Sequence, residues 1–286
     1  VTQEPQIVEP IAQVSSTKKT DMTDWFYVTS WKSSALPPKI QVPQPGCWLM
    51  FVDECGLGAE ILKQLELEGQ DVITVRVGEQ FRSPGTSSDR SREYCVNPHN
   101  RDDYDALFRD LSSLNWVPTK IVHLWNVTSP KQASLELLDA ISPAQAQGLY
   151  SLLFLVLALG QQNLKRELQI DVISSNLQSV TGDETLALEK APLLGAVRVI
   201  PLEYPHLSCR SIDVLLPDSG SGQSAELAEC LFAELSVKAS EPVIAYRGKH
   251  RWLQSFEPVP LDEPSEAAKP RLRAEGVYLI TGGLGA

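Results

Sequence analysis

The sequence has little cysteine and little histidine. Five cysteines and four histidines occur in 286 residues. The cysteines lie far apart and are odd in number, no CxxC pair occurs, and no two histidines have the spacing of metal ligands. This pattern argues against a structural zinc site and against a disulfide framework, so reduced and mostly buried thiols are expected.

Basic residues are also scarce relative to acidic ones. The chain has 25 Lys and Arg against 36 Asp and Glu, which gives a formal net charge of −11 at pH 7. Affinity for a phosphate backbone comes from clustered Lys and Arg. The composition therefore predicts no nucleic-acid partner, and it gives no indication of an anionic membrane partner.

Long hydrophobic runs and a signal peptide are missing. The longest apolar run, Leu152 to Leu159, is short of the roughly 20 residues needed to span a bilayer. The N-terminal residues Val1 to Pro5 do not have the basic, apolar and small-residue order of a secretory signal. We therefore expect a cytoplasmic protein. Because the chain begins without Met and ends within a glycine-rich motif, we also expect it to be a piece of a longer protein.

The apolar residues alternate between short continuous runs and stripes of helical period. Strands are expected at residues 25–28, 47–52, 71–77, 121–124, 168–173, 210–215, 242–246 and 251–256. Helical spacing lies between most of these runs, including a stripe from Tyr104 to Leu114 and a helix opened by Ser142-Pro143 that reaches about Asn163. Strands that are apolar throughout and separated by helices are typical of a parallel sheet buried on both faces. The predicted fold class is α/β, with a Rossmann-like, doubly wound and mostly parallel sheet.

This pattern divides the chain into four parts. Residues 1–22 are polar and aperiodic, as in an interdomain linker. Residues 23–256 form the Rossmann-like subdomain, within which residues 83–100 are predicted to be a polar loop. A proline-rich linker is expected at 257–276, and 277–286 reads as a first strand with a truncated glycine-rich turn.

The turn after the first parallel strand is one candidate nucleotide site. Gly56 and Gly58 match the first two glycines of GxGxxG, but Ile61 occupies the third position. Arg76 follows about 20 residues on, where a 2′-phosphate partner is found in related sites. Asp53 and Glu54 oppose a phosphate at this helix N-terminus. The favoured interpretation is a tight turn without a ligand, so the fold lacks a complete nucleotide-binding motif.

The end of the chain is the second candidate. The strand-like run from Val277 leads directly into a turn whose cofactor-binding candidates are Thr281, Gly282, Gly283 and Gly285. Glycines let a backbone approach cofactor phosphates closely. Strand and turn are contiguous here and no acidic residue intervenes, so this is the stronger signal. The remaining glycine and the helix would lie beyond Ala286.

Several segments together resemble one known family. The segments are Trp25 to Trp31, Trp48 to Asp53 with Gly56-Leu57-Gly58, Val122 to Trp125, Gly148 to Leu153, Gly195 to Ile200 with Glu203 to Pro205, Val243 to Gly248 with Arg251, and Tyr278 to Gly285. In this order they resemble the ketoreductase region of modular polyketide synthases, from about residue 24 to the end. There, a non-catalytic structural subdomain precedes a catalytic short-chain-dehydrogenase subdomain.

The catalytic residues of that family do not occur in this chain. A short-chain dehydrogenase needs a Tyr that delivers a proton to the carbonyl oxygen, with a nearby Lys that lowers the pKa of the Tyr. The related pattern in polyketide ketoreductases is Tyr-x-x-x-Asn. None of the seven tyrosines is followed at that spacing by Lys or Asn. The one Gly-x-Ser-x-Gly-like serine, Ser221, lies in a Gly/Ser loop. His123 is predicted to be a core histidine, Arg198 and Glu203 a structural ion pair, and Arg247 a solvated or paired strand-end residue.

The resemblance implies an architectural role. The chain would brace the catalytic ketoreductase subdomain of the same polypeptide and be inactive by itself, with no catalytic and no metal-binding residues. In the intact synthase, it implies NADPH-dependent reduction of a β-ketoacyl group on an acyl carrier protein beside other synthase domains; no cofactor is expected to bind this fragment. Two alternatives stay open: a self-sufficient nucleotide-binding enzyme that uses the Gly56–Gly58 turn with Arg76, and a degenerate ketoreductase that acts purely as a scaffold.

Overall fold

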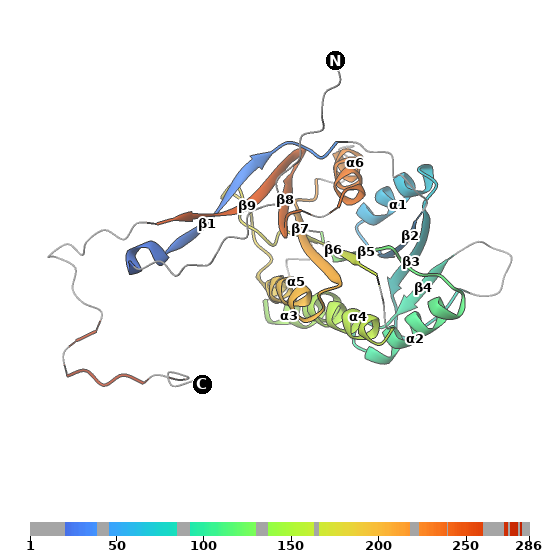
Figure 1. Ribbon diagram of the computed structural model, residues 1–286, viewed down its shortest axis with the longest axis horizontal. Coiled ribbons are helices and arrows are strands. Elements are labelled where there is room, and N and C mark those ends of the chain that lie inside the picture. Colours follow the sequence, from blue (N-terminus) through green and yellow to red (C-terminus); the bar gives the residue numbers. More distant parts are fainter. Residues whose placement is uncertain are drawn as a thin grey trace, which may run out of the picture. The chain divides into compact units, whose positions relative to one another are not determined.

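The computed structural model describes most of the chain. The described residues are 21–38, 46–84, 92–129, 137–162, 166–217, 223–238 and 240–259, with 272, 273, 275–279 and 281. The chain divides into two units, one formed by residues 1–29 and 256–286 and the other by residues 30–255. The second unit contains most of the sheet and the helices α1 to α6 (Figure 1).

One sheet organises the described residues. Its strands are β1 (Tyr27–Ser34), β2 (Cys47–Phe51), β3 (Asp71–Val77), β4 (Glu93–Val96), β5 (Lys120–Asn126), β6 (Leu168–Ser175), β7 (Leu207–Val214), β8 (Val243–Arg247) and β9 (His250–Pro258). The strand order is β1-β9-β8-β7-β6-β5-β2-β3-β4. Strands β2 to β8 pair in parallel, and β9 is antiparallel to β8. The predicted Rossmann-like, mostly parallel sheet is therefore confirmed. The order reverses between β2 and β5, which is where such sheets bind ligands.

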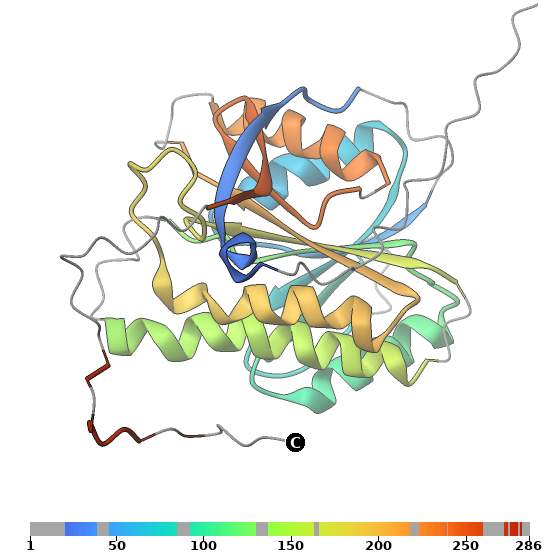
Figure 2. The ribbon, with the colours of Figure 1, turned by 60° about the vertical axis from the view of Figure 1, so that its left-hand side comes forward.

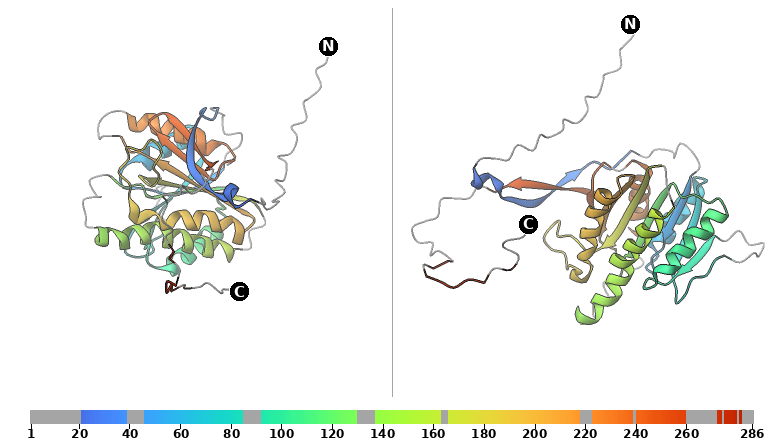
Figure 3. Two further views of the ribbon diagram at one scale, coloured as in Figure 1. Left: turned by 90° about the vertical axis from the view of Figure 1, so that its left-hand side faces the viewer. Right: turned by 60° about the horizontal axis from the view of Figure 1, so that its bottom comes forward.

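Helices cover both faces of this sheet (Figure 2; Figure 3). They are α1 (Leu57–Leu67), α2 (Arg101–Ser113), α3 (Leu137–Gln145), the π-helical segment η3 (Ala146–Tyr150), α4 (Ser151–Gly160), α5 (Pro192–Glu203) and α6 (Gln223–Ser236), with short 3₁₀ turns η1 (Met22–Trp25) and η4 (Leu188–Lys190). Helices α1 and α6 pack on one face, while α2, α4 and α5 pack on the other.

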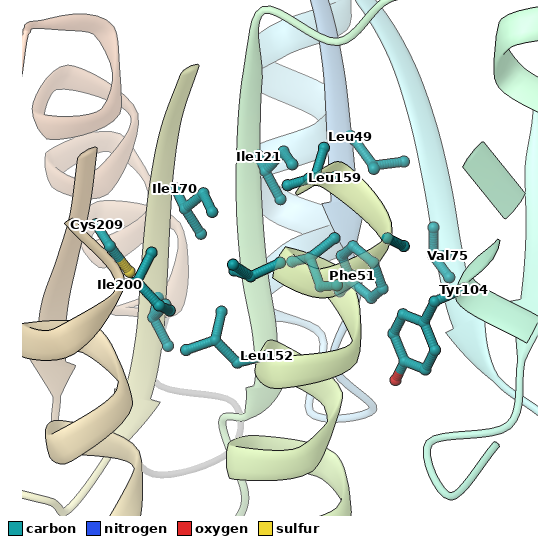
Figure 4. Packing of buried hydrophobic residues seen from close by; sticks show 14 of the residues in the cluster. Leu49, Phe51, Val75, Tyr104, Ile121, Leu152, Leu159, Ile170, Ile200 and Cys209 are labelled. Atoms are coloured by element: carbon teal, nitrogen blue, oxygen red, sulfur yellow. The ribbon is translucent and has the colours of Figure 1, made fainter. Parts of the chain in front are cut away.

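Alternating side chains of the central strand fill two separate cores. Leu49 and Phe51 of β2 belong to the core beneath α2, α4 and α5 (Figure 4). Trp48 and Met50 belong to the core beneath α1 and α6. Successive residues of a strand point to opposite faces, so a run that is apolar at every position requires two covered faces.

The predicted polar loop at residues 83–100 is partly wrong. Strand β4 lies within it, pairs in parallel with β3, and buries Tyr94 and Val96. Arg82 forms a further antiparallel bridge with Cys95. The four residues of β4 are too few to give a readable alternation, and their burial depends on β3 and on α2, where Tyr94 donates a hydrogen bond to Asp110.

The predicted helix start at Ser142-Pro143 is also wrong. The chain is already helical from Leu137, so Pro143 lies inside α3 and is followed by the π-helical turn. Proline cannot donate to the carbonyl four residues earlier, yet the helix continues through this position into η3. In η3, a Cβ on Gly148 would lie 2.2 Å from the Asn126 amide nitrogen, so only glycine allows this close approach to β5.

The segment Asp139–Gly160 is long and apolar enough to cross a membrane by composition alone. In the structure it lies across one face of the sheet, where Leu152, Leu155 and Leu159 are buried in the core. Core helices of proteins without a membrane span pass the same compositional test. Its outer side carries exposed apolar residues that become important below.

Candidate functional site

The loop between β2 and α1 occupies the usual phosphate position of a Rossmann fold. Asp53 is 4% exposed, and its carboxylate accepts hydrogen bonds from the backbone amides of Gly58 (2.6 Å) and Leu57 (3.2 Å). These amides at a helix N-terminus are the groups that would otherwise face an anion. The side chain of Asp53 therefore takes the place that a pyrophosphate would need.

The two glycines of this turn serve the aspartate. Gly56 has a φ of +92°, a conformation that other residues adopt only with strain. A Cβ on Gly58 would lie 2.8 Å from the Asp53 carboxylate and 3.0 Å from Val52. Burial raises the pKa of Asp53, and the hydrogen bonds from Gly58 and Leu57 partly oppose that rise. The partial glycine motif thus lets the Asp53 carboxylate bind the free amides at the N-terminus of α1.

Arg76, the candidate 2′-phosphate partner, is already engaged. Its Nε lies 2.8 Å from a carboxylate oxygen of Glu93 on the neighbouring strand β4, and both side chains are about half exposed. The crevice beside the turn has a volume of only about 60 Å³ and is lined in part by Asp53, Cys55 and Gln147. The groups that would bind the phosphates of a dinucleotide are therefore engaged within the chain, and the crevice is too small for the whole cofactor.

His123 is a core residue, as predicted. It is fully buried on β5, and its Nε2 lies 2.8 Å from the hydroxyl of Ser151. The ring stacks on Phe51 with centroids 5.0 Å apart. Burial lowers the pKa of His123 to about 3, so the ring is neutral at physiological pH and has no access to a substrate.

A buried lysine at the same edge was not anticipated. Lys190 donates to the Thr128 hydroxyl (2.8 Å), the Ser175 carbonyl (2.8 Å) and the Ser175 hydroxyl (3.0 Å). These contacts join η4 to the carboxyl ends of β5 and β6. Burial lowers the pKa of Lys190 to about 8. The sequence Leu188-Glu189-Lys190 is typical of an exposed polar turn, so nothing in it predicts that the lysine is buried and hydrogen-bonded to the strand ends.

Charged residues form two buried clusters away from the crevice. The first joins Asp171, Arg210, Glu234 and Arg251, with Tyr246 donating to Glu234. In the second, Arg247 pairs with Asp213 and Glu184, each at 2.8 Å.

Arg247 is thus a paired strand-end residue, in agreement with the sequence prediction. The predicted Arg198–Glu203 pair is wrong: exposed Arg198 donates to Gln254 (3.2 Å) instead. Helix α5 continues to Glu203, so these two residues are five apart on the helix and do not face each other.

The candidate turn at the end of the chain is only partly described. Gly282, Gly283 and Gly285 lie outside the described residues, and Thr281 is exposed. Val277 and Leu279 are almost fully exposed, and residues 275–279 contain no strand. The assignment of cofactor binding to Thr281 and the three glycines stays a prediction.

Known proteins resemble this chain over most of its length. A family model described as "Beta-ketoacyl synthase-like, N-terminal" matches residues 48–234. A protein of Aspergillus clavatus described as "6-methylcalicylic acide synthase" is 34% identical over 116 residues, which cover 40% of this chain and 6% of that protein.

Solved structures match the fold. The ketoreductase-containing structure of a keto acid-selecting NRPS module is 28% identical, covers 91% of this chain and 20% of that one, and has a TM-score of 0.73. An N-terminal ketoreductase from the macrolactin assembly line is 19% identical (84% and 46% covered, TM-score 0.64). A-type ketoreductases from a modular polyketide synthase are 18% identical (87% and 46% covered, TM-score 0.57). The chain spans less than half the length of each of these proteins.

Proposed function

The chain belongs to the beta-ketoacyl synthase-like, N-terminal family, and from this premise we propose that it is the structural subdomain of a polyketide synthase ketoreductase and braces a separate reductase subdomain. In this proposal the chain itself performs no chemistry. The crevice is occupied by Asp53, and His123 is buried, which supports a role in architecture.

The observation that carries the proposal is an exposed apolar surface on two neighbouring helices. It is formed by Tyr150, Leu153, Leu157, Val199 and Leu202, and we call it the α4/α5 face. Helix α4 is apolar on all sides, and such a helix is normally buried all round. Contiguous exposed apolar surface marks an interaction site. We infer that the reductase subdomain covers this face.

A second exposed apolar segment supports the same role. Phe26 and Val28 at the start of β1 and Phe256 near the end of β9 are each about half exposed or more. The two strands lie side by side, and the Val259 amide donates to the Phe26 carbonyl (2.9 Å). The pairing of β9 with β8 reaches only Leu253, so the part that carries Phe256 and Phe26 has two strands. A two-stranded pair is marginally stable in water, and a partner on these aromatic side chains would stabilise it.

The partner would supply the reaction. By the resemblance, the reductase subdomain binds NADPH and reduces a β-ketoacyl group carried on an acyl carrier protein, in a cytoplasmic multidomain synthase. Hydride then comes from the cofactor, and the proton donor comes from the reductase subdomain. The contribution of this chain is to hold that subdomain in its folded arrangement.

The self-sufficient nucleotide enzyme is less well supported. It requires free amides at Leu57 and Gly58 and a free Arg76, whereas the amides bind Asp53 and Arg76 pairs with Glu93. A pure scaffold without an active reductase partner is the second candidate. Both alternatives are addressed by the following experiment.

The experiment compares two matched leucines in the intact ketoreductase-containing protein. Leu202 is 78% exposed on α5 within the α4/α5 face, and Leu67 is 80% exposed at the end of α1 on the opposite side of the sheet. We expect Leu202→Arg to lower NADPH-dependent reduction of a β-ketoacyl thioester about tenfold or more, because a charge enters an apolar interface. Leu67→Arg should retain activity within about twofold of the unsubstituted protein.

Equal activity of both variants and the unsubstituted protein would contradict the bracing role. If the intact protein shows no reduction at all, the scaffold alternative is supported instead. Reduction by this chain alone would overturn both and support the enzyme alternative.

A further inference from the structure

A second, larger cavity lies beside the closed crevice. Its volume is about 370 Å³, and it shares Val77 and Gln147 with the crevice. The walls combine apolar and polar groups, among them Val77, Pro143 and Ala146 with Glu79, Asn97 and His99. Pockets for small organic ligands have this size and this mixture of surfaces.

The cavity lies where a Rossmann fold holds the nucleoside half of a dinucleotide. In such sites an acidic residue about 20 residues after the first glycine accepts hydrogen bonds from the ribose hydroxyls. Glu79 follows β3, stands at about this distance from Gly56, and lines the cavity. Its backbone carbonyl accepts a hydrogen bond from the Asn97 side chain (2.9 Å), which holds the loop in place. Within the described residues, no hydrogen bond or ion pair engages its carboxylate.

The phosphate half of the same site is closed. Asp53 holds the helix amides, and the crevice beside it has a volume of only about 60 Å³. A phosphate placed there would meet the Asp53 carboxylate at close range, and two like charges at short distance repel strongly. The pocket at Glu79 therefore suits a nucleoside, whereas the crevice at Asp53 disfavours a phosphate.

We propose that this cavity binds an uncharged nucleoside and discriminates against nucleotides. The Glu79 carboxylate accepts hydrogen bonds from the ribose hydroxyls. The base lies against Val77 and Pro143, and the Gln147 amide is available to its polar edge. This binding is independent of the bracing role, because the cavity residues are separate from the α4/α5 face.

The proposal is tested by calorimetric and ligand-detected NMR titration of the full chain with adenosine, 2′-deoxyadenosine and AMP. For adenosine we expect a Kd on the order of 0.1–1 mM, in line with a small ligand of this size. AMP and 2′-deoxyadenosine should each bind about tenfold more weakly, because one meets Asp53 and the other lacks a hydroxyl for Glu79.

Two variants locate the site. Glu79→Gln should weaken adenosine binding about tenfold, whereas Glu66→Gln, an exposed residue of α1 outside the cavity, should leave it unchanged. No saturable adenosine binding up to about 10 mM, an unchanged affinity in Glu79→Gln, or tighter binding of AMP than of adenosine would each overturn the proposal. Because both substitutions are at exposed positions, the variants should keep the unfolding midpoint of the parent chain.

Discussion

Replacement of Glu234 by Gln should destabilise the chain more than any conservative surface change. Glu234 lies on α6 and is fully buried. One carboxylate oxygen accepts from Arg210 (2.8 Å) and Arg251 (3.2 Å), and the other accepts from Arg251 (2.6 Å) and Tyr246 (2.7 Å). Burial alone raises the pKa of Glu234, but the hydrogen bonds from Arg251 and Tyr246 outweigh it and lower the pKa.

The magnitude follows from the charge balance of this cluster. Two guanidinium groups, Arg210 and Arg251, face two carboxylates, Asp171 and Glu234, and all four are at least nine-tenths buried. Lys120 adds a third cation, 3.9 Å from Asp171, so positive charge already exceeds negative charge in this cluster. A Gln at 234 removes one negative charge and turns its amide hydrogens toward a guanidinium. Breaking a buried pair in this way costs about 3–5 kcal/mol, which corresponds to a fall in Tm of roughly 10 °C for a domain of this size.

The same substitution on the same helix provides the control. Glu226 pairs with Lys249 at 2.9 Å, but both side chains are about half exposed or more, so Glu226→Gln should cost about 0–1 kcal/mol. Urea unfolding followed by tryptophan fluorescence measures both variants. A loss of less than about 1 kcal/mol for Glu234→Gln, or equal losses for the two variants, would refute the role assigned to the buried cluster.

Three further predictions concern the carboxyl edge of the sheet. The pKa of Lys190 is about 8 in the folded chain and about 10.4 in the unfolded chain. Between pH 8 and 10.4 the unfolded state therefore binds more protons, and the free energy of unfolding should rise by about 3 kcal/mol. In urea unfolding at several pH values, Lys190→Met should abolish this rise. The pKa of His123 is about 3 in the folded chain and about 6.5 in the unfolded chain. Acidification from pH 6.5 to 3 should therefore lower the free energy of unfolding by up to about 5 kcal/mol. A His123→Phe variant that loses as much stability as the parent over this range would contradict this. Asp53→Ala should lose about 1–2 kcal/mol of stability measured by thermal unfolding. Asp53→Asn keeps the length of the side chain and one acceptor oxygen for the amides of Leu57 and Gly58, so it should lose less; equal losses would show that accepting from these amides is not its role.

The sequence predicts the sheet well where burial alone determines structure. The expected strand at residues 71–77 coincides with β3, and 47–52 differs from β2 by one residue. Residues 47–52 are apolar at every position, whereas 71–77 is rich in β-branched residues and alternates, with Ile73 and Val75 buried; both patterns are typical of strands. Strand β4 was missed because its burial depends on Tyr94 meeting β3 and α2, which are contacts that a four-residue polar-flanked run does not reveal.

In the candidate site, too, features set by neighbouring residues could be predicted, and features set by distant contacts could not. The acidic residues at the first turn predict that phosphate is disfavoured there, and the hydrogen bonds of Asp53 with the helix amides agree with that prediction. The expectation that Pro143 opens a helix is wrong, because α3 begins at Leu137 and the chain stays helical on both sides of the proline. The contacts of Lys190 with Thr128 and Ser175 join positions far apart in the sequence. Such long-range polar contacts leave no periodic pattern in the sequence.

The most direct test of the bracing role is amide hydrogen exchange, measured for this chain alone and for the intact ketoreductase-containing protein. If the reductase subdomain covers the α4/α5 face, peptides from α4 and from the last turns of α5 exchange more slowly in the intact protein, while the C-terminal turn of α1 around Leu67 exchanges at the same rate in both. Equal exchange of α4 and α5 in the two samples would contradict the account.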